Sequence, residues 1–231
     1  MSPNKKPDGS SPAAMPADEA GRLQALHEFR LLDTLPEAVY DDLAFIASQI
    51  CQTPIALVSL VDGERQWFKA KVGLDAEQTP RDLAFCAHAI LDPEQIFQVA
   101  DASRDERFNT NPLVTGGPNI RFYAGVPLVT ADGHAVGTLC AIDRIPRALS
   151  DEQLRALRAL SREVVTQMEL RRSIADLEQA LAAAQASRAA TAARPVTSNN
   201  SSEADDRIRS LLLRMQQLQK RGSDATPGPR N

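Results

Sequence analysis

Residues 120–147, IRFYAGVPLVTADGHAVGTLCAIDRIPR, decide the fold of this chain. Two runs of strand-forming residues flank ADGH at 131–134, and Asp-Gly between such runs is a strong hairpin signal. Period-two alternation assigns the side chains of each run to two faces. Phe122, Ala124, Val126, Leu128 and Thr130 share one face of the first run; in the second, Val136, Thr138, Cys140 and Ile142 alternate with Gly137, Leu139, Ala141 and Asp143. The stretch therefore predicts two adjacent antiparallel strands.

Outward from the hairpin, the preceding sequence predicts alternating short helices and strands. Residues 55–61, IALVSLV, are almost continuously apolar and predict a strand covered on both faces. The expected elements before the hairpin are a helix from residue 23 that breaks near 33–36, a helix from 37 to about 50, strands at 55–61, 65–72 and 96–100, a helix at 83–91, one helical turn at 105–108 and an irregular loop at 109–119. The first helix carries Leu23, Leu26, Phe29 and Arg30 at helical spacing, the second places Leu43, Ile46, Ala47 and Ile50 along one face, and in 65–72 Trp67 and Lys69 alternate with Gln66, Phe68 and Ala70.

A long helix is predicted after the hairpin. Ser150 is a good N-cap, and acidic residues follow it in the first turn of a helix that runs to about residue 193. Its apolar stripe changes phase near 168–172, which is where a domain-packing helix would become a coiled coil. The later part of that stripe consists of Ile174, Leu177, Leu181 and Ala184. The expected organisation is a disordered tail at 1–20, one domain at 21–172, a coiled-coil helix at 173–193, a linker at 194–205, an amphipathic helix at 206–220 and a disordered tail at 221–231.

Composition limits the function classes. All ten aromatic residues lie between Phe29 and Tyr123, which favours one globular domain over two. A net charge of −4 argues against a general nucleic-acid binder. The three cysteines, Cys51, Cys86 and Cys140, lack disulfide or zinc spacing and favour reduced thiols in a cytoplasmic protein. The sequence shows no secretory signal or membrane span, so we expect a soluble protein.

Several ordered segments resemble the GAF family, the small-molecule-sensing modules of bacterial signalling proteins. Besides the hairpin, these segments are LLDTLPEAVYDDLAFIASQICQTPIALVSLVDGERQWFKAKVG, RDLAFCAHAI and VADASRDERFNTNPLVTGGPNIRFYAGVPL. The resemblance covers roughly residues 21–172. It implies an α+β fold: a central antiparallel sheet of five or six strands flanked by helices, with a ligand pocket on one face and a long C-terminal helix. Residues 83–91 and 109–119 resemble the cover of that pocket.

The resemblance also implies a function. GAF modules commonly precede a diguanylate cyclase or histidine kinase, and no kinase, nucleotide-binding or GGDEF-type sequence follows the long helix here. We therefore expect a sensory or regulatory protein, not an enzyme, that binds a small ligand, forms a homodimer and signals in trans to a partner such as a kinase or cyclase. Two alternatives stay open: an interaction module that binds no ligand, and a thiol-based redox sensor or enzyme that uses Cys86.

The candidate ligand-binding residues are Phe85, Cys86, His88, Asp101, Arg121 and Tyr123. Cys86 and His88 are two positions apart, so on a helix they point roughly 200° from each other and do not face one ligand. Their order, Cys-Ala-His, does not match the adjacent cysteine and histidine of bilin-binding GAF domains. The sequence identifies no cofactor.

Two further candidates share a strand face opposite Phe122. Arg121 and Tyr123 are both expected to project toward the pocket. An arginine there would hold a carboxylate or phosphate through two parallel hydrogen bonds. The structural alternative is an ion pair of Arg121 with Asp101, Asp105 or Glu106. The hairpin residue His134 is expected to be exposed, and His27 has no partner visible in the sequence.

Overall fold

The computed structural model describes residues 11–192 and 209–210. By internal contacts the chain divides into two units, Met1–Gln179 and Ala180–Asn231. The first unit contains a sheet of strands β1 (Ile55–Val61), β2 (Arg65–Val72), β3 (Gln78–Pro80), β4 (Phe97–Val99), β5 (Phe122–Val129) and β6 (Ala135–Asp143). Its order is β3-β2-β1-β6-β5-β4 with antiparallel neighbours, which confirms the predicted α+β sheet.

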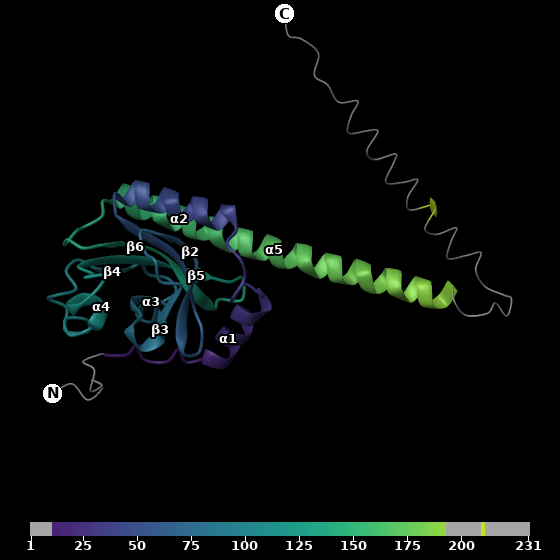
Figure 1. Cartoon of the computed structure of the whole chain (residues 1–231), viewed down its shortest axis with the longest axis horizontal. Helices are drawn as coiled ribbons and strands as arrows, with labels where there is room; N and C mark the ends of the chain where they lie inside the picture. Colours follow the sequence, from purple (N-terminus) through teal and green to yellow (C-terminus); the bar gives the residue numbers. More distant parts are fainter. Residues whose placement is uncertain (1–10, 193–208, 211–231) are drawn as a thin grey trace, which may run out of the picture. The chain divides into compact units, whose positions relative to one another are not determined.

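Helices cover both faces of the sheet. They are α1 (Glu19–Glu28), α2 (Ala38–Cys51), the short α3 (Phe85–Ala89) and α4 (Pro112–Thr115), and α5 (Asp151–Ala192). Figure 1 shows α2 and α5 side by side over one face, and α3 and α4 on the other. We call these the α5 face and the α3 face of the sheet. Each carries its own apolar core, with Ala124 and Leu139 on the α5 face and Leu57 and Cys140 on the α3 face.

β1 lies between β2 and β6 near the middle of the sheet, and every residue in it is buried. Alternate side chains enter the two cores: Val58 and Leu60 lie on the α5 face, and Leu57 and Val61 on the α3 face. This is the arrangement that a continuous apolar run predicts. Nearly all the apolar surface of β1 is therefore withdrawn from water, at about 25 cal/mol per Å².

Two register irregularities correct the predicted alternation. Between β1 and β2, Val58 pairs with Ala70 and Ser59 with Phe68, so Ala70 joins Trp67 on the α5 face instead of lying opposite it. Between β5 and β6 the register shifts next to Leu128, and Val136 lies in the α5-face core rather than with Cys140. An extra residue in one strand reverses the side-chain phase beyond it, which a period-two pattern cannot reveal.

The predicted buried face of the second helix was partly wrong. α2 buries Leu43 and Ala47 as expected, but its core-facing set is Tyr40, Leu43, Ala44, Ala47, Ser48 and Cys51. Ile46 is 41% exposed, and Ile50 is half-buried. The packed face is therefore rotated from the one that the bulkiest apolar residues indicated, and small side chains form much of it. Small residues let α2 approach the sheet closely.

The start of the chain also differs from the expectation of disorder through residue 20. The structure describes the chain from Ser11, and α1 begins at Glu19 with the Asp18 side chain accepting a hydrogen bond from Gly21 N. α1 then ends at Glu28, and Arg30 and Asp33 adopt positive φ values of 51° and 60°. The break therefore begins earlier than the region around 33–36 that the sequence indicated.

The start of α5 confirms the predicted cap. Ser150 N donates to Gln153 Oε1 at 2.9 Å, and Gln153 N donates to Ser150 Oγ at 3.3 Å. This reciprocal pair satisfies two backbone groups that the helix itself cannot. The expected linker, second amphipathic helix and terminal tail lie outside the described residues, apart from residues 209 and 210, which are helical. Among the described residues, no helix is long and apolar enough to cross a membrane.

Candidate functional site

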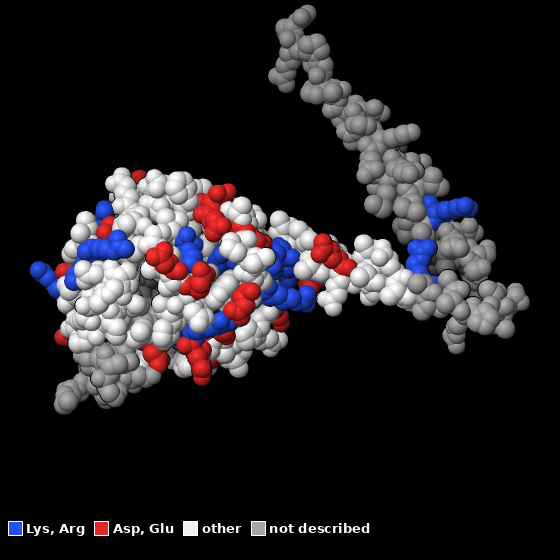
Figure 2. Space-filling model, viewed as in Figure 1, with Lys and Arg blue, Asp and Glu red and all other residues white. Residues whose placement is uncertain are grey.

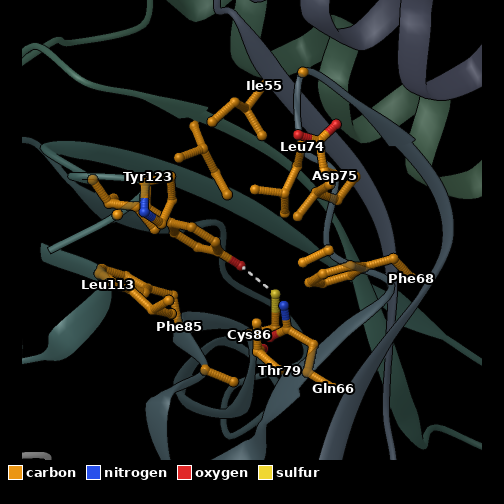
Figure 3. Close-up of a pocket in the computed structure, with 18 of the residues that line it drawn as sticks. Ile55, Gln66, Phe68, Leu74, Asp75, Thr79, Phe85, Cys86, Leu113 and Tyr123 are labelled. Atoms are coloured by element: carbon orange, nitrogen blue, oxygen red, sulfur yellow. Dashed lines mark hydrogen bonds between the residues drawn. The ribbon is translucent and has the colours of Figure 1, made fainter.

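A pocket of about 350 Å³ opens on the α3 face of the sheet (Figure 3). β1, β2, β5 and β6 form its floor, and α3 and the segment around α4 contribute its cover. Phe85 and Leu113 come from these two covering segments. Both segments were expected to cover the pocket, although the predicted helix at 83–91 is shorter, and the loop at 109–119 includes α4.

Aromatic rings form one wall of the pocket. Phe85 stacks on Phe108 with ring centroids 3.9 Å apart and on Tyr123 at 5.3 Å. Phe68, from β2, lies across the cavity from Tyr123 (Figure 3). Stacked rings resist displacement, because each is packed against the next. The wall is therefore a rigid apolar surface that suits a flat ligand.

Cys86, Tyr123 and Thr138 form a triangle of polar groups that includes one of these rings. The Tyr123 hydroxyl donates to Cys86 Sγ at 3.2 Å, Thr138 Oγ1 donates to the same sulfur at 3.0 Å, and the two oxygens lie 3.4 Å apart. All three residues are buried. Since a buried hydroxyl needs a partner, the triangle fixes the Tyr123 ring and the Cys86 thiol relative to each other.

The triangle also changes the acidity of the thiols. Burial alone raises the pKa of Cys86, but hydrogen bonds from Cys140, Thr138 and Tyr123 outweigh it and lower that pKa to about 7. Burial and the neighbouring Cys86 raise the pKa of Cys140 well above its usual value. Of these two thiols, the one that lines the pocket therefore loses its proton first.

Gly125 provides the space that Tyr123 occupies. A Cβ atom at Gly125 would lie 2.2 Å from the Tyr123 hydroxyl oxygen, two residues earlier on the same strand face. The Tyr123 ring therefore lies flat over Gly125, which lets its hydroxyl reach Cys86. A larger residue at this position would displace the ring.

Two polar atoms in the pocket have no hydrogen-bond partner in the part of the chain that the structure describes. They are Gln66 Oε1 and Thr79 Oγ1, both of which are buried. Gln66 on β2 pairs with Thr79 on β3, so the two side chains are cross-strand neighbours. A buried polar group without a partner costs about 1–3 kcal/mol, so these atoms mark a place where the pocket lacks a complementary group.

Charged side chains line the pocket at Asp75 and Arg144. Asp75 lies in the segment between β2 and β3, and exposed Arg144, directly after β6, donates from Nε to Pro118 O at 3.1 Å. The rest of the lining is apolar or uncharged. The interior therefore offers hydrogen bonds and apolar contact rather than charge.

Of the predicted site residues, the pocket brings together Phe85, Cys86 and Tyr123. His88 lies outside it: its Nε2 is 3.2 Å from Ser11 O, and its ring packs against Phe97 and Phe108. Burial lowers the pKa of His88 to about 4, so its ring is neutral at pH 7. As expected from their spacing, Cys86 and His88 point to different surroundings.

Asp101 and Arg121 also lie outside the pocket. Asp101 accepts hydrogen bonds from the backbone and hydroxyl of Ser103 in a surface turn. Arg121 Nη1 donates to Val114 O at 2.9 Å and to Ile120 O at 3.0 Å. The Arg121 guanidinium therefore holds the covering segment by its backbone carbonyls and does not face the cavity. The expectation that Arg121 projects toward the ligand assumed a strand that begins one residue earlier than β5 does.

The predicted roles of the other two histidines were incomplete. His134 is only 24% exposed and lies between Asp132 and Asp18, at 3.0 and 3.2 Å. These carboxylates raise the pKa of His134. His27 has a partner in Asp62 Oδ1, at 3.2 Å. In the described ranges no three His, Cys, Asp or Glu side chains are grouped as a metal site.

Sequence reasoning missed Gln66 and Thr79. Gln66 is an uncharged polar residue within an otherwise largely buried strand. That feature was the sequence signal that could have marked it as a candidate site residue. Thr79 gave no such signal, because it lies between the predicted strand at 65–72 and the predicted helix at 83–91, where no element was expected. The edge strand β3 brings it beside Gln66.

The model of the GAF domain family matches residues 35–168. This chain belongs to the GAF domain family. It is 45% identical over 159 residues to cyclic di-GMP phosphodiesterase PA2567 of Pseudomonas aeruginosa. That match covers 68% of this chain and 27% of the relative, so the chain spans about a quarter of the relative's length.

Solved structures resemble this chain at low sequence identity. A domain of a protein assigned as a two-component sensor histidine kinase in Sinorhizobium meliloti has a TM-score of 0.51 at 18% identity, covering 64% of this chain and 99% of that one. The GAF domain of a phosphoenolpyruvate-protein phosphotransferase from Acinetobacter has a TM-score of 0.48 at 18% identity, covering 69% and 98%. The GAF domain in the present chain has a role in sensing and signalling.

Proposed function

We propose that this GAF domain binds a small ligand in the α3-face pocket and relays the bound state through α5 to a partner protein in trans. The observation that carries this proposal is the position of the pocket and α5 on opposite faces of one sheet. Alternate side chains of the same strands line the pocket and pack under the helix. A shift of a strand on the pocket face therefore also moves the side chains that pack against α5 on the other face.

A chain of polar contacts runs from the pocket strand to α5. Phe68 of β2 lines the pocket, and the next residue, Lys69, points to the opposite face. Lys69 Nζ donates to Glu37 Oε1 at 2.7 Å, and Arg171 Nε of α5 donates to the same oxygen at 2.9 Å. Glu37 thus joins β2 to α5. We propose that a change in β2 on ligand binding alters the position of α5 through this carboxylate.

Ligand control requires two arrangements of α5 with different affinities for the ligand. A ligand that binds both equally shifts nothing, however tightly it binds. We propose that the arrangements differ in how α5 pairs with a second copy of the chain. Leu170, Ile174, Leu177 and Leu181 are each about half exposed or more, at helical spacing that suits a parallel coiled coil.

The partner we propose is a signalling enzyme such as a kinase or cyclase. The phosphodiesterase relative carries a similar GAF region and is named for cyclic di-GMP, which supports a partner in cyclic-dinucleotide signalling. We propose a binding and relay role rather than catalysis for the present chain. A cytoplasmic setting fits its three free buried thiols.

The experiment is native mass spectrometry of the chain purified from the cells that make it. We expect a reproducible non-covalent added mass on a dimer. Leu74→Trp, which fills the pocket, should abolish that mass, and the control Leu91→Trp, outside the pocket, should retain it. A clean apo mass for the unsubstituted protein would contradict ligand binding and favour a ligand-free interaction module.

A second candidate, a thiol-based redox sensor, is favoured by the lowered pKa of Cys86. Cys86→Ser separates the two. A redox sensor loses its response to peroxide in this variant, whereas the relay proposed here retains ligand-dependent signalling. Loss of the peroxide response with intact folding would favour the thiol-based function.

A further inference from the structure

The strongest unexplained feature of the pocket is its pair of unpartnered polar atoms. Gln66 is only 6% exposed, yet its Oε1 accepts no hydrogen bond from the described residues. Thr79 Oγ1, its cross-strand neighbour, is buried and has no described partner either. Natural proteins pair nearly all buried polar groups, so two neighbouring exceptions in one cavity indicate where a ligand supplies the partners.

Figure 3 shows where these atoms lie. Gln66 and Thr79 are grouped with Cys86 at one end of the cavity, below Phe68, and Leu74 and Ile55 line the other end. The sulfur of Cys86 already accepts from Tyr123 and Thr138. The hydrogen-bonding capacity left for a ligand at this end therefore belongs to Gln66 and Thr79.

The walls limit the charge of the ligand. The ring faces of Phe68, Phe85 and Tyr123 and the aliphatic side chains around them contribute no charge. The charged lining residues, Asp75 and Arg144, are of opposite sign; Figure 3 shows Asp75 at the end of the cavity opposite Gln66, and Arg144 is exposed. An ion buried beside Gln66 would lose its hydration without gaining a counter-charge, which is costly.

The volume of the cavity limits the size of the ligand. A cavity of about 350 Å³ corresponds to roughly twelve water molecules at about 30 Å³ each. Such a space suits a ligand of one or two rings and not a large polyanion. The stacked rings on one side favour a flat shape.

We propose that the pocket takes a neutral, flat compound of one or two rings that carries an N–H donor beside a carbonyl on one edge, as in a lactam or cyclic imide. The N–H donates to Gln66 Oε1, the Gln66 amide donates to the ligand carbonyl, and Thr79 Oγ1 adds a further contact to the same edge. A carboxamide presents such an acceptor and donor side by side. This inference rests on the proposed function, since it names the ligand class of the same pocket.

The test uses three probes of nearly equal shape and the full chain. They are isoquinolin-1(2H)-one, its N-methyl derivative, which lacks the donor, and isoquinoline-1-carboxylate, which is charged. Calorimetry or ligand-observed NMR measures their dissociation constants. We expect the lactam to bind at least about tenfold more tightly than the N-methyl compound, because the latter leaves Gln66 unpartnered. The carboxylate should bind more weakly still.

A matched pair of variants assigns the effect to the residue. Gln66→Met keeps the length of the side chain without its amide and should reduce the preference for the lactam to about one. Gln98→Met, at an exposed position on β4, should leave it unchanged. The comparison of probes on the unsubstituted chain needs no variant, so it holds even where Gln66→Met fails to fold.

Equal binding of the lactam and its N-methyl derivative, or tighter binding of the carboxylate, would overturn the ligand class while leaving the pocket a binding site. No binding of any probe to folded protein would also overturn the class. In that case native mass spectrometry tests the proposed function separately. An added mass would support ligand binding in the pocket, and a clean apo mass would contradict both ligand binding and the proposed ligand class.

Discussion

The ammonium of Lys69 lies 2.7 Å from Glu37 Oε1, with the Lys69 side chain fully buried and Glu37 34% exposed. The same nitrogen donates to Thr34 Oγ1 at 2.8 Å and to Leu35 O at 2.7 Å, so all three of its protons have acceptors. A buried cation is tolerated only when it is paired in this way. Partial burial raises the pKa of Glu37, but Lys69 and Arg171 outweigh it, and the pKa is lowered overall.

Glu37→Gln should therefore destabilise the fold. The variant removes the carboxylate that faces the buried ammonium and leaves Arg171 bonded to the backbone carbonyls of Phe29 and Arg30. We expect a loss of about 1–3 kcal/mol in the free energy of unfolding, less than for a fully buried pair because Glu37 is partly exposed. Urea titration measures it. The control is Glu28→Gln, which removes the exposed Glu28–Arg172 pair at 3.6 Å and should change stability by less than about 0.5 kcal/mol. Equal effects of the two variants would argue against the coupling role of Glu37.

Gly125→Ala should disturb the pocket without changing any group that lines it. The added Cβ would meet the Tyr123 hydroxyl, and the ring cannot yield easily because Tyr123 is fully buried and stacked on Phe85. We expect a loss of about 1–3 kcal/mol, typical of overpacking, together with a rise in the pKa of Cys86 as its hydroxyl donor moves away. Thermal unfolding and a pH titration of thiol alkylation measure these effects. An unchanged titration would show that Tyr123 does not govern Cys86.

The three cysteines should react in a defined order. Cys86 lines the pocket and has a pKa lowered to about 7, whereas burial raises the pKa of Cys51 to about 11. A small reagent such as iodoacetamide should therefore modify Cys86 first at pH 7–8, as peptide mapping by mass spectrometry would show. A bound ligand should slow this reaction by blocking the pocket. Faster modification of Cys51 would contradict the assignment.

Acid should weaken the cluster formed by Glu19, Arg22 and Arg81. Partial burial raises the pKa of Glu19, but the two guanidinium groups outweigh it and lower the pKa from 4.5 to about 2. Because the folded pKa is below the unfolded one, this stabilisation is complete above about pH 5 and is lost as the pH falls towards 2. It amounts to at most about 3 kcal/mol. Urea unfolding between pH 6 and pH 3 should show a shallower pH dependence in Glu19→Gln than in the unsubstituted chain. Parallel profiles would contradict the assignment.

We expect the proposed dimerisation through α5 to depend on its exposed apolar stripe. Leu177 and Leu181 are 70% and 60% exposed. The double variant Leu177→Glu and Leu181→Glu should convert a dimer to a monomer, because like charges replace the apolar seam. Light scattering coupled to size-exclusion chromatography measures the mass. Ala183→Glu lies on the opposite side of the helix and should leave the dimer intact. A dimer that survives the double variant would place the interface elsewhere.

Sequence reasoning predicted the hairpin, the buried strand β1 and the long capped helix because each has a local cause. Asp-Gly specifies the turn, a continuous apolar run specifies a central strand, and Ser150 with Gln153 specifies a helix start. These signals lie within a few residues of the structure that they specify. The family resemblance then placed the pocket cover correctly.

The errors arise where structure depends on distant contacts. The bulge beside Lys69 and the rotated face of α2 follow from how the sheet and helix pack, not from local periodicity. Thr79 enters the site only because a three-residue edge strand pairs with β2. His88 contacts Ser11 O, 77 residues earlier in the chain, a partner that local periodicity cannot reveal.

The alternation of side chains along β1, β5 and β6 has an evolutionary consequence. Residues that line the pocket and residues that pack against the helices occupy successive positions in the same strands, but they face opposite ways. Substitutions at the pocket positions can therefore change the shape and polarity of the cavity while the helical layer remains intact. If the pocket binds a ligand as proposed, a lineage with this architecture can exchange one stimulus for another and keep its downstream connections.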